Sequence, residues 1–169
     1  MTTTAVLVAS FSLREGNEPN PCNRRLALEA LRIYWELVEE GRKPILIVQW
    51  EVGLALRLLG QGRLIYKEIG QLEDGAYLGT KEIFDVAVGL FEDRGATEFV
   101  GIANAFIHQP YLYWLARRHF RLVWKRVRGI GFDSDSDQWW CRSWWQLLAY
   151  TGYGFVTGAH GHDGRQAKA

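Results

Sequence analysis

The stretch TEFVGIANAFIHQPYLYWLARRH, residues 97–119, decides the fold predicted for this chain. It opens with a short apolar run at residues 99–103, passes through a mixed segment that contains His108, and continues after Pro110 with helical character. Proline is favoured in the first turn of a helix, where its missing N–H would have no partner in any case. We therefore expect a strand, a loop and a helix in this order, with His108 at the carboxyl end of the strand.

Four further segments have strand character, at residues 5–9, 44–48, 63–69 and 121–127. The first two are continuous apolar runs, which are typical of strands buried on both faces. Helical segments between the strands start near Pro21, Glu51 and Thr80, and residues 139–155 read as a closing aromatic helix. Strands that alternate with helices predict right-handed crossovers and a parallel sheet. We expect an α/β, three-layer Rossmann-like domain with about five mostly parallel strands over residues 1–156, followed by a flexible tail at residues 157–169.

The charge balance excludes partners that are recognised by a strong electrostatic field. The formal net charge is +1, so the chain attracts neither nucleic acid nor an anionic membrane at long range. The basic segment at residues 117–128 interleaves Phe120 and Trp124 with basic side chains, a pattern also seen in nucleic-acid-binding surfaces. We interpret it as an edge strand protected by its charges, and we expect no nucleic-acid partner.

The cysteine count and the apolar runs point to a cytoplasmic protein without a membrane span. Two cysteines far apart in the chain, Cys22 and Cys141, cannot build a zinc site or a disulfide framework. The amino terminus lacks the basic segment of a signal peptide, and no apolar run approaches the length needed to cross a bilayer. The acidic segment at residues 133–137 and the histidines at residues 160–162 lack the spacing or scaffold of a metal site, and we expect none.

Two candidate catalytic residues follow predicted strands. His108 comes after the central strand and Glu51 after the strand at residues 44–48, so both should lie at the sheet edge where open α/β sheets bind ligands. A histidine titrates near neutral pH and a glutamate can accept a proton or bind a hydroxyl group. The alternatives are a histidine that bonds a local carbonyl and an acid favoured by the helix dipole.

Four candidate ligand-binding residues lie at the same edge. Ser10 opens the long loop after the first strand, and Arg25 lies early in the following helix, where a guanidinium could hold a phosphate. Thr80 is a good helix cap whose hydroxyl could also contact a ligand. Asn104 follows the central strand and could bond a polar group of the ligand.

These residues carry a resemblance to a known family. Arg25 in NRRLALEAL, Glu51 in ILIVQWEVGLAL, Thr80 and Glu82 in GTKEIF, and His108 in VGIANAFIHQPY follow its order and spacing. Over about residues 5–155 the chain resembles the YdcF/SanA-like family, a cell-envelope-associated domain of unknown function that also includes ElyC. The resemblance implies a link to envelope metabolism and affinity for S-adenosylmethionine or another nucleotide-like molecule.

The chain also departs from the family pattern. Residues other than glycine follow the first two strands, which keeps the backbone farther from a phosphate, and an arginine that could clamp a phosphate is replaced. The substituted positions are Ser10, Phe11, Gln49, Trp50, Ile83 and Tyr111. They indicate a divergent member with an altered ligand or without the ancestral activity.

The sequence is compatible with two functions. The first is a small-ligand-binding domain or weak enzyme that acts on a phosphate-bearing or nucleotide-like molecule. The alternative is a non-catalytic interaction protein that uses its aromatic C-terminal region for oligomerisation or partner binding. The tryptophans of this region could stack on a flat ligand, but their spacing favours core packing or a subunit contact; they are Trp139, Trp140, Trp144 and Trp145.

Overall fold

A computed structural model describes residues 1–11, 19–70, 78–104 and 108–157, with side chains up to residue 150. The longer helices and the strands, in chain order, are β1 (Thr3–Val8), α1 (Pro21–Glu39), β2 (Lys43–Gln49), α2 (Trp50–Leu58), β3 (Ile65–Ile69), α3 (Thr80–Glu92), β4 (Glu98–Ile102), α4 (His108–Ala116), β5 (Arg121–Leu122) and α5 (Trp144–Thr157). All five strand segments expected from the sequence therefore contain a strand.

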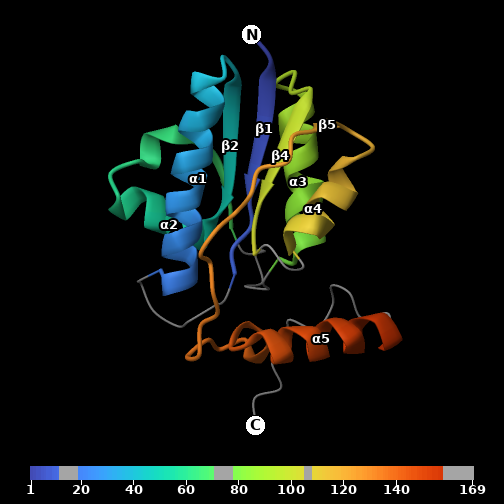
Figure 1. The fold of residues 1–169 in the computed structure, drawn as a ribbon. Helices are drawn as coiled ribbons and strands as arrows, with labels where there is room; N and C mark the ends of the chain where they lie inside the picture. The colour runs from blue at the N-terminus through green and yellow to red at the C-terminus, as the bar shows by residue number, and fades with distance from the viewer. Residues whose placement is uncertain (12–18, 71–77, 105–107, 158–169) are drawn as a thin grey trace.

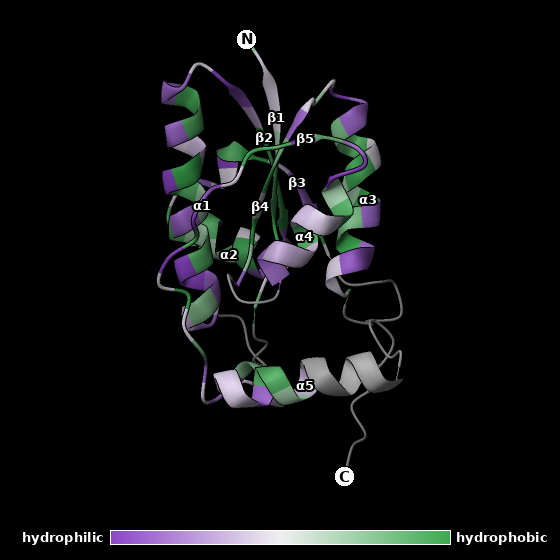
Figure 2. Cartoon of the chain, turned by 45° about the vertical axis from the view of Figure 1, so that its right-hand side comes forward, coloured by the Kyte–Doolittle hydropathy of each residue, from purple (hydrophilic) through white to green (hydrophobic). Residues whose placement is uncertain are grey.

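The five strands form one sheet in the order β3-β2-β1-β4-β5, and every neighbouring pair is parallel (Figure 1). Helices α1 and α2 cover one face of the sheet and α3 and α4 cover the other, as Figure 2 shows with the sheet between them. This confirms the predicted three-layer α/β fold. No helix in the described ranges is both long enough and apolar enough to cross a bilayer.

The core lies on both faces of the sheet because side chains along each strand alternate between them. Val6 and Val8 of β1 pack under α1 and α2, whereas Ala5 and Leu7 pack under α3 and α4; all four are fully buried. Gly101 of β4 allows the close approach of α4, since a Cβ atom there would lie 3.1 Å from Cβ of Leu112. The strands that carry the candidate site are thus fixed from both sides.

The strand expected at residues 121–127 is shorter than predicted. β5 ends at Leu122, and the amide of Val123 still donates to the carbonyl of Phe99 in β4 (2.9 Å). The residues after Val123 cross the α1 face of the sheet as an irregular segment (Figure 1). We call residues 123–130 the strap. Tyr113 on α4 donates a hydrogen bond from its hydroxyl to the carbonyl of Val123 (2.8 Å), and Gln109 donates to the carbonyl of Lys125 (2.8 Å). Two backbone carbonyl groups of the strap thus find hydrogen-bond donors on α4, outside the sheet.

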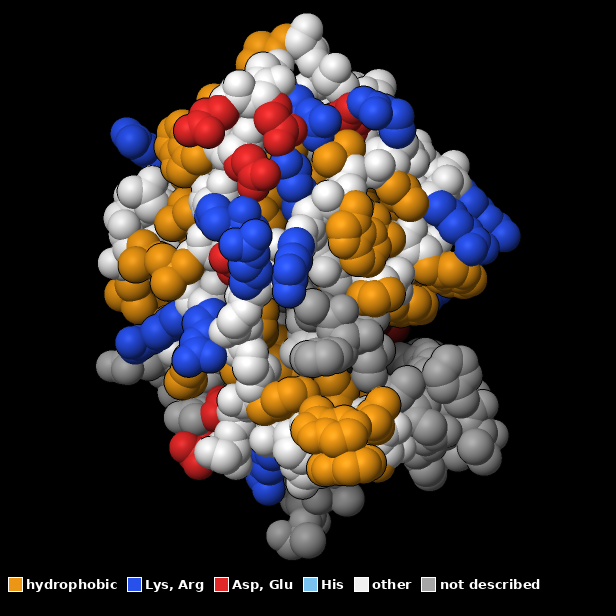
Figure 3. Space-filling model, viewed as in Figure 1, with side chains coloured by type: hydrophobic (Ala, Val, Ile, Leu, Met, Phe, Trp, Pro, Cys, Tyr) orange, Lys and Arg blue, Asp and Glu red, His pale blue; other side chains and the backbone are white. Residues whose placement is uncertain are grey.

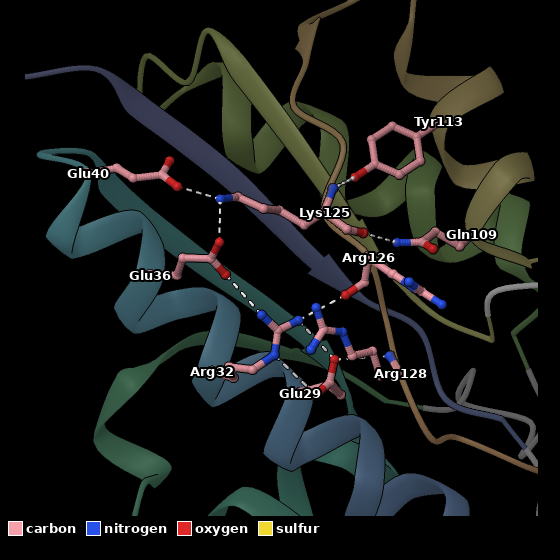
Figure 4. A network of polar contacts seen from close by, with 9 residues as sticks. All are labelled: Glu29, Arg32, Glu36, Glu40, Gln109, Tyr113, Lys125, Arg126 and Arg128. Atoms are coloured by element: carbon pink, nitrogen blue, oxygen red, sulfur yellow. Dashed lines mark hydrogen bonds and ion pairs between the residues drawn. The ribbon is translucent and has the colours of Figure 1, made fainter.

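The other side of the strap is tied to α1 (Figure 4). The Lys125 ammonium pairs with Glu36 (3.0 Å) and with Glu40. Arg32 donates to the carbonyl of Arg126 (2.8 Å). The basic residues of the segment thus serve partly as attachments between the strap and α1, a role that the alternating sequence pattern did not reveal.

The closing aromatic segment also differs from the prediction. Residues 139–141 form a short 3-10 helix, and α5 begins only at Trp144. α5 lies beyond the carboxyl ends of the strands and runs across their direction (Figures 1 and 2). Leu147 is 2% exposed and belongs to the core on the α1 face. The expected tail was residues 157–169; Thr157 is the last residue of α5, and residues 158–169 lie outside the described residues.

The spacing of the tryptophans around the start of α5 suggests core packing or a subunit contact, but most of these side chains are not part of the core. Trp139, Trp144 and Trp145 are 43%, 47% and 67% exposed, and only Trp140 is half-buried. Figure 3 shows hydrophobic side chains gathered on the surface at this position. Of the two packing roles expected for these residues, core packing is wrong for the three exposed tryptophans, because the segment lies at the periphery of the sheet, whereas a subunit contact stays a prediction.

Candidate functional site

The candidate site lies at the carboxyl edge of the sheet, where the chain direction changes. From β1 the chain moves outward to β2 and β3, and it then returns to the other side of β1 as β4. The loops after β1 and β4 lead to helices on opposite faces of the sheet, and such a switch point opens the crevice in which open α/β sheets bind ligands. Ser10 follows β1, while Asn104 and His108 follow β4.

Hydrogen bonds hold the end of β1 in place. The amide of Ser10 donates to the side-chain oxygen of Gln49 at the end of β2 (2.9 Å), and the amide of Phe11 donates to Asn23 of α1 (2.9 Å). The Gln49 amide group donates in turn to the carbonyl of Leu78, ahead of α3 (3.5 Å). Gln49 therefore links β1, β2 and the segment that leads into α3.

Glu51 is a buried acid in the first turn of α2. The residue is 4% exposed, and neither of its carboxylate oxygens has a hydrogen-bond partner of normal geometry in the described part of the chain. Burial raises the pKa of Glu51 to about 7, although the nearby Ser10 hydroxyl lowers it. A carboxyl group with a pKa of this value can give or take a proton at neutral pH.

His108 is the first residue of α4 and is half-buried. Its ring packs edge-on against the ring of Phe11, with 5.6 Å between the centroids, so Phe11 restricts its orientation. Burial lowers the pKa of His108 to about 4, and the ring is therefore neutral at pH 7. Its Nδ1 atom is buried and finds no partner among the described residues.

Buried polar atoms without a partner concentrate at this edge. Besides Glu51 and His108, the indole nitrogen of Trp50 and the Oε2 atom of Glu82 lack partners within the ranges that the structure describes. Trp50 opens α2, and Glu82 lies in the first turn of α3. Buried polar groups are nearly always hydrogen-bonded, so a group of exceptions at one edge marks it as the candidate site.

Two more unpartnered atoms lie at the opposite edge of the sheet and have a structural explanation. They belong to Arg42 and Glu98, which form an ion pair (3.4 Å between Nε and Oε2). Glu98 also accepts a hydrogen bond from Thr4 (3.0 Å) and pairs with Arg121. These charges neutralise one another, whereas no Lys, Arg or His in the described ranges forms an ion pair with Glu51 or Glu82.

The predicted ligand-binding residues have different surroundings. Asn104 is buried, and its carbonyl accepts a hydrogen bond from the amide of Gln109 (3.0 Å). Thr80 is half-buried at the start of α3, but the cap of this helix is Gly79, so the prediction of a threonine cap is wrong by one residue. The Glu82 carboxylate lies against Gly79, where a Cβ atom would be 2.6 Å from its Oε2.

Arg25 has a hydrogen-bond partner in the strap. Its guanidinium donates a hydrogen bond to the carbonyl of Gly129 in the strap (2.9 Å) and lies on the exposed side of α1. Among the described residues, no hydrogen bond or ion pair joins Arg25 to Glu51 or His108. The structure thus places Ser10 beside Glu51 and Phe11 beside His108, and it does not bring Arg25 into contact with them.

Sequence reasoning missed three polar residues of this edge, namely Gln49, Trp50 and Glu82. In the sequence pattern, Gln49 and Trp50 stand only as replacements for glycines, and Glu82 only as part of a helix start. The one available signal was their position, since each lies at a strand end or in the first turn of a helix that follows one.

The chain matches no protein-family model, and neither a curated protein nor a solved structure is significantly similar to it.

Proposed function

We propose that this protein binds a small phosphate-bearing or nucleotide-like molecule at the carboxyl edge of its sheet and can transfer a proton to or from it. The observation that carries this proposal is the group of buried, unpartnered polar atoms on Trp50, Glu51, Glu82 and His108. A ligand that bonds them would remove the cost of leaving buried polar groups unsatisfied.

The helix directions support an anionic group on the ligand. Helices α1, α2, α3 and α4 each follow a strand of the parallel sheet, so all four begin at the carboxyl edge. The amino end of a helix carries free N–H groups and partial positive charge, which favour phosphate. Glu51 and His108 would then handle protons or hydroxyl groups, with Ser10, Thr80 and Asn104 as the polar surroundings.

A thermal-shift screen of nucleotides, sugar phosphates and S-adenosylmethionine tests this proposal. A ligand at a hundred times its Kd should raise the Tm by roughly 5–10 °C. His108→Ala should reduce the shift, and Arg25→Ala should do so only if the guanidinium leaves Gly129 to reach the ligand. The proposal fails if no such compound raises the Tm, or if the shift is the same in His108→Ala.

The exposed tryptophans support a second candidate function, a non-catalytic role in which α5 docks a second copy of this chain. Trp144, Trp145 and Leu148 are 47%, 67% and 49% exposed. Residues 144–150 carry no charge, so two such faces can meet without bringing like charges together. Exposed apolar groups of this kind are typical of interaction surfaces.

A further inference from the structure

Two carboxylates flank the end of β2 from opposite faces of the sheet. Glu51 lies at the start of α2, which packs on the same side as α1, and Glu82 lies at the start of α3, which packs on the other side. Both groups have oxygens without a hydrogen-bond partner in the described part of the chain. The end of β2 therefore lies between two acceptors that lack a hydrogen-bond partner of normal geometry among the described residues.

Gln49 connects the surroundings of these carboxylates. Its side-chain oxygen accepts a hydrogen bond from the amide of Ser10, and the Ser10 hydroxyl lies close enough to Glu51 to lower the pKa of that carboxyl. Its side-chain nitrogen donates to the carbonyl of Leu78, which directly precedes Gly79. The Glu82 carboxylate lies against Gly79. A continuous series of contacts thus runs from one carboxylate to the other around the end of β2.

The chemistry of these groups restricts the ligand that fits them. An ionised carboxylate only accepts hydrogen bonds, and a buried one needs donors to offset its lost hydration. A phosphate dianion has no donor and is repelled by both carboxylates when they are ionised, so it does not suit the end of β2. Hydroxyl groups on neighbouring carbons do suit it, because each can donate to one carboxylate.

The region between the ends of β1 and β4 has the opposite character. His108 is the first residue of α4 and packs against Phe11, whose amide is held by Asn23 in the first turn of α1. The amino ends of α1 and α4 therefore meet here, and none of the described residues in this group is acidic. This region accommodates a negative charge better than the end of β2 does.

Building on the proposed function, we infer that the ligand is a ribose- or sugar-containing phosphate. Its adjacent hydroxyl groups donate to Glu51 and Glu82 at the end of β2, and its phosphate lies toward His108 between β1 and β4. Glu82 is then a specificity-determining residue of the site and not only a first-turn acid that favours the start of α3.

Matched ligands test this orientation by isothermal titration calorimetry on the full chain. Adenosine 5′-monophosphate should bind at least about tenfold more tightly than its 2′,3′-dideoxy analogue, because the analogue lacks the two hydroxyl groups that donate hydrogen bonds to the carboxylates. Glu51→Gln and Glu82→Gln should each bring the affinity ratio closer to one. The control Glu39→Gln changes an exposed residue at the far end of α1 and should preserve the ratio. Ribose 5-phosphate serves as a probe without a base.

The outcomes separate this inference from the proposed function. Equal affinity of the native chain for the two nucleotides would overturn the hydroxyl contacts while leaving a phosphate-binding site. A ratio that is unchanged in both Gln variants would place hydroxyl recognition elsewhere and would also overturn the inference. If neither nucleotide nor ribose 5-phosphate binds, both the inference and the proposed function fail.

Discussion

Burial of the Glu51 carboxyl couples the stability of the fold to pH. The pKa of this group rises from 4.5 to about 7 on folding, so between these values the folded chain keeps a proton that the unfolded chain loses. The free energy of unfolding therefore decreases as pH rises through this window, by roughly 3 kcal/mol. For His108 the pKa falls from 6.5 to about 4, so its contribution increases as pH rises from 4 to 6.5.

We predict opposite pH profiles for variants of these two residues. Relative to the native chain, Glu51→Gln should gain stability as pH rises from 4.5 to 8, because it removes a buried group that loses its proton. His108→Gln should lose its relative stability as pH rises from 4 to 6.5. Urea unfolding at a series of pH values measures both, with Glu39→Gln as the control. Profiles parallel to that of the native chain would contradict the assigned burial of the two groups.

Position in the chain was enough to predict that Glu51 and His108 lie at the carboxyl edge. It could not predict which polar residues around them lack hydrogen-bond partners. Both follow apolar runs that had to become strands, so their place at the carboxyl edge followed from the parallel topology. Whether a polar atom there finds a partner depends on packing between distant segments. That is why Glu82 and Trp50 emerged only from the structure, and why the bond of Arg25 to Gly129 was not foreseen.

At the scale of the elements, apolar runs predicted β1, β2 and β4 well because these strands are buried on both faces. The prediction at residues 121–127 failed after Leu122, since alternation of apolar and basic residues suits an edge strand and a strap equally well. The strap is instead defined by long-range partners such as Tyr113 and Glu36, which no local pattern reveals.

The attachment of α5 to the domain can be tested with two adjacent leucines. Leu147 is 2% exposed in the core on the α1 face, whereas its neighbour Leu148 is 49% exposed. Leu147→Ala should lower the free energy of unfolding by about 2–4 kcal/mol through the lost burial and the cavity left behind. Leu148→Ala should change it by less than about 1 kcal/mol. Equal effects in urea unfolding would mean that α5 does not dock through Leu147.

At the scale of the molecule, the alternation of strands and helices was sufficient to predict a parallel sheet with helices on both faces. The position of α5 beyond the carboxyl edge was not predictable, because its aromatic pattern fits a buried helix as well as an exposed one. If the second candidate function is correct, the exposed tryptophans of α5 should control whether the chain forms a dimer or larger assembly.

Light scattering tests the second candidate function. If α5 pairs with a second copy, the native chain should be a dimer or larger, and replacing Trp144 and Trp145 by serine should yield monomers that keep the native circular dichroism spectrum. The matched control is Leu28→Ser, which changes an exposed apolar residue on a different helix, α1, and should not change the assembly. A monomeric native chain at high concentration would rule out pairing through α5.

The ligand site itself is tested most directly by a crystal structure of the chain soaked with adenosine 5′-monophosphate. We expect electron density at the carboxyl edge, with hydroxyl groups in contact with Glu51 and the phosphate between the ends of β1 and β4. Density on another surface, or an empty edge at a concentration that saturates binding in solution, would contradict a site at this position.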